Sequence, residues 1–170
     1  SRPADDATFL RRAFLDTTGV LPAAVEVRNF LADTSKNKRD RVIDSLLSRT
    51  AFVAYWTHKW SDVLLIDGKR LPQPAVQAYY QWLHRQVEQN RPWDQLAYDV
   101  IVARGSSMEN GATNFYALHA DAESMTENVC QAFLGLSNGC AKCHNHPLEK
   151  WTDDQYYAMA SHFARVRAKG

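Results

Sequence analysis

Apolar residues recur at steps of three and four along most of this chain, which is the spacing of one face of an α-helix. No stretch alternates apolar and polar residues for long enough to predict a β-strand. Proline, glycine and asparagine interrupt the helical pattern at intervals and divide it into about seven or eight helices. We therefore predict an all-α fold.

The expected helices are defined mainly by the residues that can begin them. Serine, threonine, aspartate and asparagine cap helix N-termini, and proline fits the first turn. Between the sixth and seventh helices, Gly105 to Gly111 lacks helical periodicity and is expected to be a long surface loop. We expect helices beginning at or near Asp5, Pro22, Asn37, Thr50, Ala75, Pro92, Ser124 and Thr152.

The length of 170 residues is that of one ordinary domain, so we expect residues 1–170 to form a single helical domain around one core. The net charge of +1 gives no reason to expect nucleic acid or an anionic membrane as a partner. No apolar run approaches the roughly 18 residues of a membrane span. With three cysteines, the chain cannot be a disulfide scaffold.

The run Cys140-Ala141-Lys142-Cys143-His144 matches C-x-x-C-H, the pattern to which haem c is covalently attached. Two thiols three positions apart can each add to a vinyl group of one porphyrin, and the next histidine can then place an imidazole nitrogen on the iron. We therefore predict that Cys140 and Cys143 hold a haem c and that His144 is the proximal iron ligand. His146 cannot easily reach the opposite face of the haem, so we expect it to hydrogen-bond a propionate or a nearby backbone group.

The sixth iron ligand is left open by the sequence. A methionine or a histidine would give low-spin iron suited to electron transfer. We favour Met125, because it begins the helix that leads to the motif, although methionine on an apolar stripe is often core. Iron with five ligands is a further alternative. The other candidates are Met159, His162, His119 and Met108.

Two other interpretations of the cysteine pair are open. A structural zinc site could use both thiols with His144 and His146, but four donors would then come from seven consecutive residues, whereas zinc sites usually take their second pair from a distant segment. A disulfide or plain buried thiols are the second possibility. The third cysteine, Cys130, is expected to be a small buried hydrophobe on a helix.

The segments around the motif resemble a domain of unknown function found in large planctomycete-type cytochrome c proteins. The likeness is carried by Phe133-Leu134-Gly135, Cys140 to Pro147, Trp151-Thr152 and Asp154 to Tyr157. It extends upstream, where Arg11 to Asp16, Trp60-Ser61-Asp62 and Arg91 to Asp94 resemble the family's opening and middle signatures. His162 and Cys130 depart from its pattern.

The resemblance implies that the motif residues Cys140, Cys143 and His144, with His146, are the family's haem-motif positions. It also implies that the chain is part of a longer exported protein, so we expect a periplasmic or otherwise exported location. The expected function is that of a monohaem c-type cytochrome domain, more an electron-transfer domain than a catalyst. Its partners would be other redox domains of the same parent protein or an electron carrier. The alternatives are a haem sensor or catalytic haem with an open sixth site, and an interaction module with structural zinc.

Overall fold

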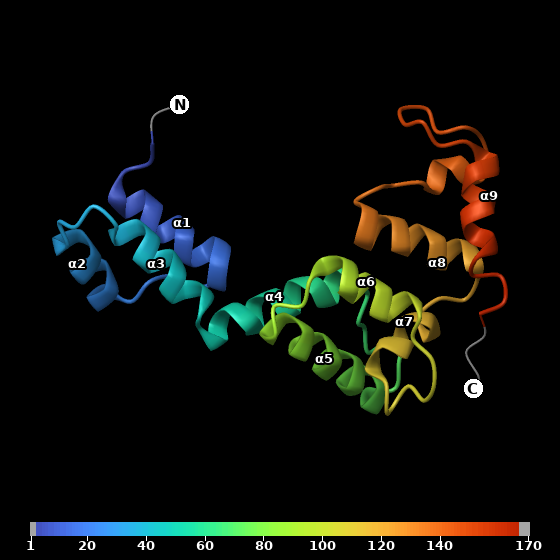
Figure 1. Ribbon diagram of the computed structural model, residues 1–170, viewed down its shortest axis with the longest axis horizontal. Helices are drawn as coiled ribbons and strands as arrows, with labels where there is room; N and C mark the ends of the chain where they lie inside the picture. Colours follow the sequence, from blue (N-terminus) through green and yellow to red (C-terminus); the bar gives the residue numbers. More distant parts are fainter. Residues whose placement is uncertain (1–2, 167–170) are drawn as a thin grey trace. The chain divides into compact units, whose positions relative to one another are not determined.

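The computed structural model describes residues 3–166, and the regular secondary structure of these residues is all helical, without a strand (Figure 1). The predicted all-α class is confirmed. The α-helices are α1 (Asp6–Thr18), α2 (Ala24–Ala32), α3 (Lys38–Leu47), α4 (Thr50–Val63), α5 (Gln73–Glu88), α6 (Trp93–Ile101), α7 (Asn114–Ala117), α8 (Ala122–Val129) and α9 (Asp153–Ser161). The other helical elements of the described part are the 3₁₀ segments η1 (Gly111–Thr113) and η3 (Gly139–Lys142) and the π-helical segment η2 (Cys130–Leu134).

Two of the predicted N-caps are confirmed by their hydrogen bonds. The Asp5 carboxylate accepts from the backbone N–H of Thr8 at 2.7 Å. The Thr152 hydroxyl accepts from the N–H of Gln155 at 3.2 Å, and the Gln155 side chain accepts in return from the N–H of Thr152 at 3.1 Å. Each cap satisfies backbone donors that the first helical turn leaves without a partner.

Other predicted boundaries were wrong by a few residues. The second helix begins at Ala24 rather than Pro22, and Thr50 is the first residue of α4 rather than a cap outside it. The helix expected from Ser124 to Leu136 starts at Ala122, after the Asp121 cap, and changes at Cys130 into the π-helical segment η2. The four-residue α7 was not predicted, because so short a helix leaves no periodic signal.

The position of the loop between α6 and η1 was predicted correctly. It ends at Gly111, where a Cβ atom would lie 2.3 Å from the carbonyl oxygen of Ala78 in α5. That distance is far below van der Waals contact, so only glycine lets η1 pack this closely on α5.

The chain divides into two compact units, residues 1–59 and 60–170, with the division inside α4. Unit 1 has a small cluster of buried apolar residues, namely Leu10, Phe14, Phe30 and Leu46. Unit 2 has a larger one, which includes Tyr79, Leu83, Val100, Phe115 and Met125. The described residues thus form two clusters where we expected one core, and a single domain over residues 1–170 stays a prediction.

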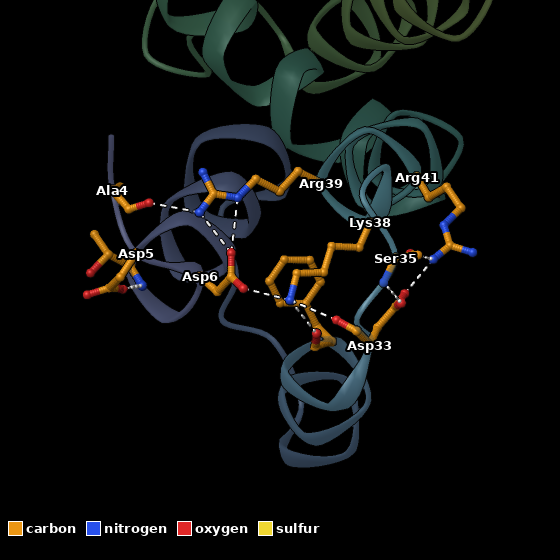
Figure 2. A network of polar contacts seen from close by, with 10 residues as sticks. Ala4, Asp5, Asp6, Asp33, Ser35, Lys38, Arg39 and Arg41 are labelled. Atoms are coloured by element: carbon orange, nitrogen blue, oxygen red, sulfur yellow. Dashed lines mark hydrogen bonds and ion pairs between the residues drawn. The ribbon is translucent and has the colours of Figure 1, made fainter. Parts of the chain in front are cut away.

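Unit 1 adds a network of ion pairs to its small cluster. The carboxylate of Asp6 in α1 pairs with Lys38 at 2.6 Å and Arg39 at 2.8 Å, both in α3 (Figure 2). These two hydrogen-bonded cations hold the pKa of Asp6 below its usual value. The same cations lie over aromatic rings, Lys38 at 4.8 Å from the centroid of Phe30 and Arg39 at 4.7 Å from that of Phe9. Charged groups therefore connect the three helices of unit 1.

Unit 2 is connected mainly by aromatic and apolar contacts. The Trp60 and Trp93 ring centroids lie 4.2 Å apart, and the Trp93 and Phe133 centroids lie 5.4 Å apart. The Asn128 side chain donates to the carbonyl oxygen of Val63 at 3.3 Å and so fixes α8 against the end of α4. Within residues 3–166, no helix combines the length and the apolar character that a membrane crossing requires.

Candidate functional site

The cysteine motif lies in η3 and the turn that follows it, between η2 and α9. Ala141 is fully buried, whereas Cys140 and Cys143 on either side of it are exposed. Neither thiol is in a disulfide. The buried alanine thus fixes the short turn to unit 2, and both sulfur atoms are accessible from outside.

The ring of His144 is held by the backbone. Its Nδ1 lies 2.7 Å from the carbonyl oxygen of Asn145. A carbonyl oxygen can only accept, so Nδ1 carries a hydrogen, and in the neutral ring Nε2 then keeps its lone pair. His144 is exposed, and its tautomer is the one in which a histidine binds a metal through Nε2.

The ring of His146 has the opposite arrangement. Its Nδ1 accepts from the backbone N–H groups of Leu148 at 3.2 Å and Glu149 at 2.9 Å. The N–H of His146 donates to the carbonyl oxygen of Trp151 at 2.7 Å. His146 therefore closes the loop after the motif by binding backbone groups, which is one of the two roles expected for it.

Helix α9 supports the motif through two consecutive tyrosines. The hydroxyl of Tyr157 donates to the carbonyl oxygen of Lys142 at 3.1 Å. The hydroxyl of the buried Tyr156 donates to Oε1 of Glu127 in α8 at 2.9 Å. Burial, together with the neighbouring Glu127 carboxylate, raises the pKa of Tyr156. These two hydroxyl bonds were not predicted from the sequence.

Behind the motif, Cys130 forms a buried sulfur contact. The thiol is fully buried, receives a hydrogen bond from the Asn138 amide at 3.1 Å, and lies 3.5 Å from the sulfur of Met159. Burial raises the pKa of this thiol, and the nearby Glu127 adds to the effect. The expectation of a small buried hydrophobe at Cys130 is confirmed. The supporting role of Asn138 was not foreseen, because an asparagine before a glycine looks like an ordinary turn residue.

Met125, the favoured sixth ligand, lies in the core of unit 2. It is 4% exposed and belongs to the large apolar cluster. It stands two residues before Glu127, and two residues correspond to about 200° of rotation around an α-helix. The side of α8 that meets α9 through Glu127 is thus nearly opposite to the side that carries Met125. Its role as a ligand stays a prediction.

The other candidate ligands are distributed over unit 2. His119 is buried and donates from Nδ1 to the carbonyl oxygen of Phe115 at 2.7 Å, which leaves the lone pair of Nε2 inside the protein. Met159 contacts Cys130. Met108 is exposed in the loop before η1, and His162 is exposed at the end of α9. Over residues 3–166, no three histidine, cysteine or acidic side chains come close enough together to hold a metal ion by themselves.

A family model for PSCyt2, described as protein of unknown function (DUF1549), matches residues 1–168. The chain belongs to this family. The match extends the resemblance seen around the motif to almost the whole sequence, across both compact units. Searches of the curated proteins and of the solved structures found no match to the chain.

Proposed function

We propose that this PSCyt2 chain is a monohaem c-type cytochrome domain that passes single electrons within a larger exported protein. The observation that carries the proposal is the arrangement of His144 beside the cysteines. Its Nδ1 donates to the Asn145 carbonyl and its Nε2 meets no hydrogen-bond partner among residues 3–166, while Cys140 and Cys143 are both exposed. These are the three groups that attachment and proximal ligation of a haem c require.

The residues around the motif fit a haem. Each thiol can form a thioether by adding its sulfur and hydrogen across a vinyl group, and neither sulfur first has to leave a disulfide. The Asn145 carbonyl orients the His144 ring and directs Nε2 away from the backbone bond. Leu134, Tyr157 and Leu148, in the segments that flank the motif, are 53%, 49% and 89% exposed. A porphyrin would cover apolar surface of this kind.

In this proposal the haem iron supplies the one-electron couple, and the protein holds it through Cys140, Cys143 and His144. His146 keeps the following loop in place. The partners would be other redox domains of the parent protein or an electron carrier, in the periplasm or another exported location, where c-type haem is attached. In this proposal Met125 is the candidate for the sixth iron ligand.

A second candidate function is favoured by the position of Met125. Because it lies in the core on the side of α8 nearly opposite Glu127, an iron with an open sixth site is a specific alternative. Such a haem would act as a sensor or a catalyst rather than as an electron carrier. High-spin oxidised iron and carbon monoxide binding by the reduced protein would favour this function. A low-spin spectrum that Met125→Leu converts to high spin would favour electron transfer.

The test is expression of the chain with an export signal and the c-type haem maturation machinery. The purified protein should show a c-type spectrum, and the pyridine haemochrome should stay with the denatured polypeptide. His144→Ala should change the spectrum of the bound haem, whereas the matched variant His146→Ala should leave the iron spectrum in place and loosen the loop. A chain without haem would contradict the proposal, and zinc found by elemental analysis would favour an interaction module with a structural metal.

A further inference from the structure

Unit 1 contains a cavity of about 310 Å³ between α1, α2 and α3, which the proposed haem site does not use. Its floor is apolar and consists of Leu10 and Phe14 from α1, Phe30 from α2 and Val42 from α3. A volume of this size is at the lower end of the range of small-molecule sites, about 300 to 1,000 Å³.

The walls of the cavity are one face of α2 and one face of α3. Two ion pairs bridge the walls, Asp33 just after α2 with Arg41 in α3, and Glu26 in α2 with Arg49 just after α3, the latter at 2.7 Å. Glu26 and Asp33 are seven residues apart, which is about 10 Å along a helix. The cavity is thus a slot roughly 10 Å long, with an ion pair at each end.

Arg41 and Arg49 each have hydrogen-bond donors that no group around the slot accepts from. Among the described residues, the side-chain hydrogen bonds of Arg41 and of Arg49 are made by Nη2 alone, so that Nε and Nη1 of each guanidinium are left over. Lys38 differs, because its ammonium group meets Asp6 and the carbonyl oxygens of Phe30 and Asp33 (Figure 2). The slot therefore offers spare cationic donors, and its best ligand carries an anionic acceptor.

Two cations stand over the apolar floor, Lys38 over Phe30 and Arg49 over Phe14, and Arg49 is the one whose guanidinium has donors left over. Its guanidinium carbon lies 5.0 Å from the centroid of the Phe14 ring. A carboxylate that binds Arg49 can therefore continue into an apolar chain lying on Phe14 and Phe30. We propose that the slot binds a small amphipathic carboxylate of medium chain length, with its carboxylate on Arg49 and its chain along the floor. The inference is independent of the haem.

The test is calorimetric titration of the whole chain with octanoate, kept below its micelle-forming concentration. 1-Octanol is the matched uncharged probe, because it has the same chain length. We expect saturable binding of one octanoate, and binding of octanol weaker by about ten-fold or more, since hydrogen bonds to charged groups are worth about 1.5 to 3 kcal/mol. Absence of saturable binding, or equal binding of the two probes, would overturn the proposal.

Three variants locate the site. Ser45→Trp fills the slot from α3 and should abolish octanoate binding, whereas Ser48→Trp, outside the lining, should leave it unchanged. Arg49→Gln should weaken octanoate about ten-fold and octanol by much less. Far-UV circular dichroism checks that each variant is folded. In the wild-type chain, octanoate should also shift the methyl NMR signals of Val42 and Leu10. Shifts confined to other residues, or full octanoate binding by Ser45→Trp, would refute the assignment.

Discussion

The two compact units are stabilised by different kinds of contact. Unit 1 has few buried apolar side chains and connects its helices by ion pairs and by cations over aromatic rings. Unit 2 has a large apolar cluster, and the hydroxyl bonds of Tyr156 and Tyr157 position the segments around the motif. The exposed motif is thus carried by the unit whose stability depends least on charge. The haem that we propose at the motif could therefore gain or lose a charge without disturbing the apolar contacts of unit 2.

The largest expected effect is that of a cavity in the core of unit 2. Leu83 is fully buried, so Leu83→Ala should lower the free energy of unfolding by about 3 kcal/mol. Leu148, which is 89% exposed, is the matched control, and Leu148→Ala should be nearly neutral. Chemical denaturation measures both variants. Similar losses of unfolding free energy in Leu83→Ala and Leu148→Ala would mean that the apolar cluster does not dominate the stability of unit 2.

The two units should lose stability at different pH values when the solution is acidified. In unit 1 the pKa of Asp6 is lowered by Lys38 and Arg39, and that of Asp33 by hydrogen bonds from Ser35. Carboxylates with a lowered pKa stabilise the folded state above their unfolded pKa, near 4, and this contribution is lost as the pH falls through the folded value. Unit 1 should therefore weaken mainly below about pH 4.

In unit 2 the acid response should begin earlier, because of His119. Burial is the main cause that lowers its pKa and Arg70 adds to it, while the bond to Phe115 and the charge of Asp121 oppose them. A lowered histidine pKa means that the unfolded state binds the proton more tightly, so stability falls as the pH drops below about 6.5. Residue-resolved hydrogen exchange from pH 7 to pH 3 measures this order. Loss of unit 1 first would contradict the comparison.

A smaller effect is expected at the N-cap of α9. Thr152→Ala removes the hydroxyl that accepts from Gln155 and should cost about 1 kcal/mol. Thr152→Ser keeps the acceptor and should retain most of the stability. Thermal unfolding measures the loss. If the alanine variant were as stable as the serine variant, the cap would not contribute to holding α9 beside the motif.

The smallest effect should come from an ion pair in unit 2. Arg91 and Asp99 pair at 2.9 Å with both side chains about one-third exposed, so Arg91→Gln should cost about 0.5 kcal/mol. Lys38→Met in unit 1 should cost at least about twice as much, because the Lys38 side chain is 15% exposed and meets three acceptors. Urea denaturation compares the two variants. Equal losses would show that ion pairs matter no more in unit 1 than in unit 2.

The parts that were predicted from sequence are those with local causes. The caps at Asp5 and Thr152 depend on residues three positions apart, and the burial of Cys130 follows from the apolar character of a free cysteine on a helix. The division into two units was not predictable, because it falls inside α4, where the helical pattern continues. At the site, the tautomer of His144 and the loop closed by His146 depend on carbonyl and N–H directions, which residue identity does not encode.

The central claim is that Cys140 and Cys143 hold one haem covalently, and the intact mass of the unfolded protein tests it most directly. After maturation with the c-type machinery, the wild-type chain should carry the added mass of one haem, and the Cys140→Ala/Cys143→Ala variant should have the mass of the polypeptide alone. A wild-type chain with the polypeptide mass, or a double variant that keeps the haem after unfolding, would contradict the account.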